Sequence, residues 1–143
     1  MAIHRFAFPT TIHFGPGARR EVAPYLRAQG CQRPLIVTDK GIAALPMLAE
    51  FKSSLKNLAV AVYAGVAGNP VKSQVDAGVE AYKAHHADSV IGFGGGAALD
   101  VAKAVALMYR SANKSAVARE VIASGVLGLH TALFRWLVLH RSY

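Results

Sequence analysis

The chain has 143 residues, of which 53% are hydrophobic and 17% are charged, and its formal net charge is +8. This composition is typical of one folded domain and excludes a disordered chain. Because no basic stripe is interleaved with aromatic residues, we do not expect nucleic-acid binding despite the positive charge. Cys31 is the only cysteine, which excludes an intrachain disulfide and suits a reducing compartment. The N-terminus lacks the pattern of a signal peptide, and we therefore expect a cytoplasmic protein.

Extended and helical patterns alternate along the first 109 residues. In chain order they predict a strand at 10–14, a helix at 18–30, a strand at 33–39, a helix at 41–57, a strand at 58–64, a helix at 71–87, a strand at 88–94 and a helix at 97–109. The strand at 58–64 (LAVAVYA) is apolar throughout, as strands covered on both faces are. The alternation predicts an α/β fold, a Rossmann-like parallel sheet with flanking helices.

A glycine triplet, Gly94, Gly95 and Gly96, lies where the strand at 88–94 gives way to a helix. Ligands of open parallel sheets bind beyond the carboxyl ends of the strands, and a helix N-terminus there favours an anion. Glycine lets the backbone approach a phosphate closely. The spacing matches neither a P-loop nor a first-strand G-x-G-x-x-G fingerprint, so a tight turn alone would also explain the triplet.

Asp39 ends the predicted strand at 33–39. A carboxylate at this position can accept hydrogen bonds from ribose hydroxyls, and it would repel a 2′-phosphate, which favours NAD over NADP. Asp39 could also cap the helix that follows it, and one side chain can serve both roles.

Several motifs in the same order resemble the iron-containing (group III) alcohol dehydrogenases. The segment GFGGGAALDVAKAVAL is similar to the GGGSxxDxAK signature of that family, and FAFPTTIHFGPGA, PLIVTDKGI and GVAGNPVKSQV are similar to its earlier segments. The resemblance covers residues 3–109 and implies an NAD(P)-dependent oxidoreductase of a primary alcohol or aldehyde. In that family a Rossmann-like domain holds the dinucleotide, and a helical domain holds iron or zinc through one Asp and three His.

The resemblance implies roles for particular residues. The glycine triplet would meet the pyrophosphate and Asp39 the adenosine ribose, and Asn69 would begin a turn near the cofactor. Asp100 and Lys103 match the acid and base of the signature, whereas Ala97 replaces its usual Ser and loses a hydroxyl donor to phosphate. The implied cofactor-binding set is Asp39, Asn69, Gly94, Gly95, Gly96, Ala97, Asp100 and Lys103.

The family pattern stops near Met108. We therefore expect a dinucleotide-binding domain at 1–109 and an atypical helical, apolar tail at 110–143, without catalytic residues or metal ligands in this chain. On this interpretation the chain is a truncated cofactor-binding portion that is inactive alone and whose exposed face favours a homo-oligomer. A non-catalytic nucleotide-binding or interaction module is the alternative. Residues 121–139 have the length of a membrane span, but Arg135 and His130 within them disfavour insertion, and a shifted reading frame would also explain the tail.

Overall fold

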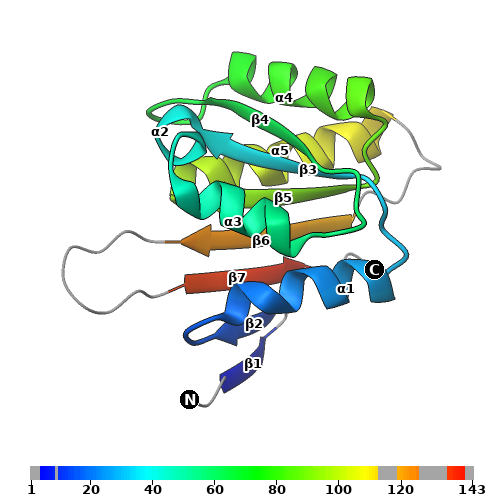
Figure 1. The fold of residues 1–143 in the computed structure, drawn as a ribbon. Coiled ribbons are helices and arrows are strands. Elements are labelled where there is room, and N and C mark those ends of the chain that lie inside the picture. Colours follow the sequence, from blue (N-terminus) through cyan, green and yellow to red (C-terminus); the bar gives the residue numbers. More distant parts are fainter. Residues whose placement is uncertain (1–3, 9, 113–118, 126–134, 141–143) are drawn as a thin grey trace.

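The computed structural model describes residues 4–8, 10–112, 119–125 and 135–140. They form a seven-stranded sheet with the order β1-β2-β7-β6-β5-β3-β4, with helices on both faces (Figure 1). The strands are β1 (His4–Phe8), β2 (Thr10–Phe14), β3 (Pro34–Asp39), β4 (Ala61–Val66), β5 (Ser89–Gly94), β6 (Arg119–Gly125) and β7 (Arg135–His140). The helices are the 3-10 turn η1 (Ala18–Glu21), α1 (Val22–Ala28), α2 (Lys40–Ala43), α3 (Pro46–Ser54), α4 (Lys72–His85) and α5 (Gly96–Ala112).

Four neighbouring strands, β4, β3, β5 and β6, run parallel. Ile36 at the centre of β3 lies opposite Val62 of β4 on one side and Ile91 of β5 on the other. Every residue of β5, and every residue of β3 before Asp39, is buried, as expected of parallel strands with helices on both faces. The predicted Rossmann-like parallel sheet with flanking helices is thus confirmed.

The two faces of the sheet carry separate hydrophobic cores. Successive β3 side chains alternate between the faces, with Ile36 in one core and Val37 in the other. The core that contains Ile36 is closed by α1 and α3, where Phe51 stacks on Phe93 of β5 with ring centroids 4.8 Å apart. The core that contains Val37 is closed by α4 and α5, with Tyr82 and Val105 among its buried members. Both faces of the parallel strands are thereby covered by packed helices.

The prediction of a helical tail at 110–143 is wrong for the part of it that forms strands. Residues 119–125 form β6, which pairs in parallel with β5, and residues 135–140 form β7, which returns antiparallel beside β6. An apolar run does not distinguish a helix from a buried strand by periodicity, and the open edge of β5 supplies a partner for a strand. Residues 110–112 of the predicted tail belong to α5, and residues 113–118, 126–134 and 141–143 lie outside the described residues.

Local boundaries differ from the predictions in three places. The single helix expected at 41–57 is two helices, because Pro46 has no N–H to continue the first and instead opens the second. The strand expected at 58–64 is displaced to Ala61–Val66. An additional strand, β1, pairs antiparallel with β2 at the N-terminal edge. Among the helices that the structure describes, none is long and apolar enough to cross a membrane.

Candidate functional site

The carboxyl ends of β3, β4 and β5 meet at one edge of the sheet, where the chain changes direction. From β3 the chain passes through α2 and α3 to β4, whereas from β5 it passes through α5 to β6 on the other side. The α3 and α5 helices lie on opposite faces, so their connections leave a crevice between the ends of β3 and β5. Such a switch point is where open α/β sheets bind ligands.

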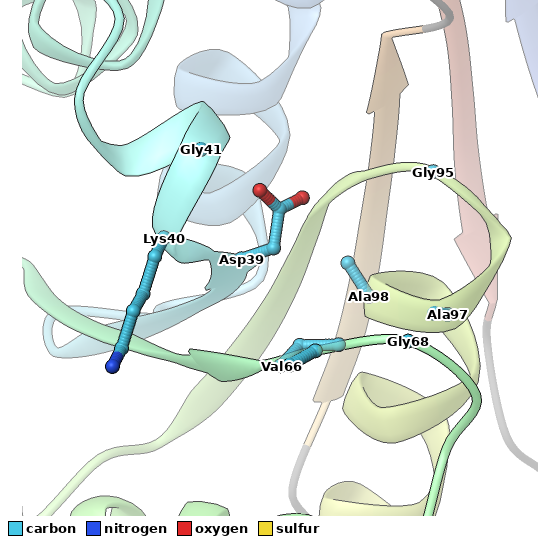
Figure 2. Close-up of a pocket in the computed structure, with 9 residues that line it drawn as sticks. Asp39, Lys40, Gly41, Val66, Gly68, Gly95, Ala97 and Ala98 are labelled. Atoms are coloured by element: carbon cyan, nitrogen blue, oxygen red, sulfur yellow. The ribbon is translucent and has the colours of Figure 1, made fainter.

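A pocket of about 400 Å³ lies in this crevice. Three segments line it: residues 39–41 after β3, residues 66–68 at the end of β4, and Gly95, Ala97 and Ala98 after β5. In Figure 2 the Asp39 carboxylate lies between Gly41 and the turn at Gly95, whereas the Lys40 side chain extends away from that turn. The pocket therefore has one acidic group facing a wall that is mostly backbone.

The glycines in β5 and in the turn that follows it serve different structural purposes. A Cβ on Gly92 would lie 3.1 Å from the Cβ of Ala102 and 3.2 Å from the Cα of Leu99, so this glycine permits the close packing of α5 on β5. Gly94 has a φ of 147°, which side chains rarely adopt. By contrast, a Cβ on Gly95 or Gly96 would meet nothing within 4 Å. The fold does not require glycine at these last two positions for space, and they leave the turn open.

The N-terminus of α5 faces the pocket. The N–H of Leu99 donates to the carbonyl of Gly95 at 3.2 Å, the first turn-closing bond of this 17-residue helix. The N–H groups of the preceding residues, including Ala97 and Ala98 in the pocket wall, have no partner within an α-helix. Free N–H groups and the positive end of the helix dipole favour an anion at this position.

Asp39 is held at the end of β3 by the helix that it starts. Its Oδ1 accepts a hydrogen bond from the N–H of Ile42 at 2.8 Å, which makes it the N-cap of α2. A Cβ on Gly94 would lie 3.5 Å from its Oδ2, so the other oxygen is near the glycine turn. The predicted cap is confirmed, and the geometry leaves the carboxylate able to accept from a ligand as well.

The structure brings together only part of the predicted cofactor-binding set. Asp39, Gly95 and Ala97 line the pocket, and Gly94 and Gly96 flank Gly95 in the turn. Asn69 follows Gly68 outside the lining. Asp100 and Lys103 form an exposed ion pair with a 3.5 Å separation on α5 and do not line the pocket.

Sequence reasoning missed the wall from β4 and the start of α2. Val66, Ala67 and Gly68 lie between the strand expected at 58–64 and the helix expected at 71–87, where only Asn69 was assigned a site role. Lys40 and Gly41 follow Asp39. These residues contribute small side chains or main-chain atoms to the pocket, and they form no recognisable sequence motif. The available signal was their position, directly after strands that were expected to be parallel.

The described residues do not fit a catalytic metal. In the part of the chain that the structure covers, no three side chains from His, Cys, Asp and Glu come together in a way that could hold a metal ion.

Comparison with known proteins identifies a family. The family model for iron-containing alcohol dehydrogenase matches residues 9–129, so the expectation that the family pattern stops near Met108 is wrong. Alcohol dehydrogenase 4 of Schizosaccharomyces pombe is 35% identical over 118 residues, which are 81% of this chain and 28% of that protein. The chain thus spans about 28% of the length of this curated relative.

Solved structures share the fold. A 1,3-propanediol oxidoreductase superposes with a TM-score of 0.70 and 20% identity, over 87% of this chain and 39% of that one. A sulfoacetaldehyde reductase from Bifidobacterium kashiwanohense in complex with NAD+ has a TM-score of 0.61 and 30% identity, over 64% of this chain and 24% of that one.

Proposed function

Because this chain belongs to the iron-containing alcohol dehydrogenase family, we propose that its carboxyl-end pocket binds a nicotinamide adenine dinucleotide. The chain would serve as the cofactor-binding part of an NAD-dependent alcohol dehydrogenase. The observation that carries this proposal is the open glycine turn and α5 N-terminus lying opposite the Asp39 carboxylate in one pocket. The relative that is described in complex with NAD+ supports the same cofactor class.

The two sides of the pocket suit the two polar parts of a dinucleotide. On the α5 side, main-chain N–H groups at Gly96, Ala97 and Ala98 would donate to the pyrophosphate, and Gly95 leaves room for it to approach. On the β3 side, Asp39 would accept from the ribose hydroxyls, and its charge would disfavour the 2′-phosphate of NADP. The bound nicotinamide would supply hydride acceptance from an alcohol, or hydride donation to an aldehyde.

The remaining members of the predicted set have weaker support. Asn69 follows the pocket residue Gly68 and would reach a dinucleotide from the rim. Asp100 and Lys103 face solvent as an ion pair, and their role in cofactor binding stays a prediction from the signature. The Ser of the signature is Ala97 here, so the α5 side would hold phosphate through main-chain donors alone.

Calorimetric titration with NAD tests the proposal, with Gly95→Asp compared against Gly95→Asn. Both side chains enter space that is open in the fold, so their steric effects are matched. The aspartate alone places a negative charge beside the pyrophosphate, and we expect it to weaken NAD binding at least about tenfold relative to the asparagine variant. Equal affinities for the two variants would contradict the pyrophosphate position.

The same sample tests turnover. Every residue to which we assign a role here binds the cofactor, and none is assigned to the alcohol. We therefore propose that the 143-residue chain binds NAD without oxidising a primary alcohol, as followed by NADH absorbance. Formation of NADH by the isolated chain would refute this part of the proposal.

A further inference from the structure

The β4 wall of the pocket is tied to the first turn of α4 by one side chain. Val66, Ala67 and Gly68 form this wall where β4 ends. The Gln74 side chain reaches back from α4, and its Nε2 donates to the carbonyl of Ala67 at 2.6 Å. Ala67 is itself exposed and lies in the connection between the two elements, so this bond fixes a backbone position that neither β4 nor α4 fixes alone.

Tyr63 of β4 fixes the main chain of Gln74 through a hydrogen bond. Its hydroxyl donates to the main-chain carbonyl of Gln74 at 2.8 Å, which joins the centre of β4 to α4 where the helix lies over that strand (Figure 1). The ring fits because Gly65 leaves space for it, since a Cβ on Gly65 would overlap the Tyr63 ring and hydroxyl. Tyr63, Gln74 and Ala67 thus form a continuous brace from strand to helix to pocket wall.

The Gln74 amide makes one hydrogen bond through its nitrogen, but it buries its oxygen at a cost to stability. Because the Ala67 carbonyl can only accept, Nε2 must face it, and this leaves Oε1 buried without a hydrogen-bond partner among the described residues. A buried acceptor without a partner opposes folding. If the side chain were apolar, the exposed Ala67 carbonyl could bond to water instead. Stability alone therefore gives little reason for an amide at this position, whereas its hydrogen bond to Ala67 contacts the pocket wall directly.

We propose that Gln74 is a positioning residue for the dinucleotide pocket, which sets the β4 wall by holding the Ala67 carbonyl. This inference rests on the proposed function. Gln74 acts through Ala67 and does not line the pocket. A pocket wall that is already held in place loses less conformational freedom when a dinucleotide binds than a wall that binding must order. Binding to the wall that is held in place is therefore tighter.

Gln74→Met tests this role, because methionine has a similar length but can neither donate to Ala67 nor leave a buried acceptor. We expect the NAD dissociation constant to rise about three- to tenfold, with the melting temperature unchanged within error. Amide hydrogen exchange of the peptide spanning residues 66–70 should become faster. Gln74→Glu keeps the shape but replaces the donor with an acceptor, and should weaken NAD binding at least as much.

Ser73→Ala is the matched control, since Ser73 is exposed on the same turn of α4, and it should leave NAD binding unchanged. Wild-type affinity in Gln74→Met, or a loss of affinity matched by a fall in melting temperature, would overturn the positioning role. Failure of the wild-type chain to bind NAD would instead overturn the proposed function, so the two failures are distinguishable.

Discussion

At the scale of single residues, Asp39 combines a structural and a proposed recognition role in one carboxylate. The first role is visible, since Oδ1 caps α2 through the N–H of Ile42. The second follows from the position of the carboxylate across the pocket from the glycine turn. The two roles depend on different properties of the side chain, because capping requires an acceptor and rejection of a 2′-phosphate requires a negative charge.

Asp39→Asn separates these roles. Asparagine caps a helix as well as aspartate does, so the melting temperature should hold while the charge is lost. We expect the ratio of NADP to NAD affinity to rise at least about tenfold, as measured by titrating both dinucleotides into both proteins. Asp39→Ala should also lose about 1 kcal/mol of stability through the missing cap. An unchanged affinity ratio in Asp39→Asn would argue against the ribose assignment.

The residues that sequence reasoning found and those it missed differ in how they contribute. Asp39 and Gly95 were predicted because a strand-end carboxylate and an open glycine turn are chemical signals in the chain itself. Ala67 was not predicted, since it contributes a main-chain wall that any small residue could provide. Gln74 was predicted only as part of the helix at 71–87, because its bond to Ala67 can be recognised only when β4 and α4 are placed together.

At the scale of elements, the packing of α5 on β5 depends on the missing side chain of Gly92. Gly92→Ala would place a Cβ 3.1 Å from both the Leu99 Cδ2 and the Ala102 Cβ, which is too close without a shift of the helix. We expect a loss of about 1–3 kcal/mol of unfolding free energy, as measured by urea denaturation. Gly96→Ala is the control, since its Cβ meets open space and the change should stay within about 0.5 kcal/mol. Equal stability of the two variants would contradict close packing as the reason for Gly92.

Element types were predictable where local pattern decides them, and not where a distant partner does. The α4 helix and the β5 strand are each encoded in one short segment, and both were predicted, at 71–87 and at 88–94. For β6 and β7 the apolar sequence suits either a helix or a strand, and the open edge of β5 favours a strand. Pro46 marks the start of α3 and separates it from α2. The helical spacing of the apolar residues around Pro46 nevertheless led us to predict a single helix at 41–57.

At the scale of the whole molecule, the alternation of strands and helices along the sequence predicted the parallel part of the sheet. It did not predict the antiparallel strands that extend the sheet. Strand–helix–strand units predict parallel neighbours, and β3, β4 and β5 are arranged in this way. The pairing of β2 with β7 joins Ile12 to Val138, residues from opposite ends of the chain that no local pattern connects. The position of the pocket was nevertheless predictable, because it lies at the carboxyl ends of the parallel strands.

Tyr82 reports on unfolding of the whole molecule at alkaline pH. It is 1% exposed between α4 and α5 and packs against Tyr109 with ring centroids 4.4 Å apart. Burial, with smaller contributions from Tyr109 and Asp88, raises the pKa of the Tyr82 hydroxyl well above its usual value near 10. The folded protein therefore keeps this proton after the unfolded chain has lost it. The stabilisation is complete below about pH 10 and is lost as the pH rises above that value.

The free energy of unfolding should consequently fall with rising pH above about pH 10, and Tyr82→Phe should make this fall shallower while keeping the ring contact with Tyr109. Urea denaturation of both proteins at about pH 8 and about pH 11 measures the difference. Tyr25→Phe, a substitution on α1 on the opposite face of the sheet, controls for the loss of a tyrosine in general. Parallel pH profiles for wild type and Tyr82→Phe would mean that the hydroxyl can release its proton without global unfolding, and that the interface between α4 and α5 admits water in the native state.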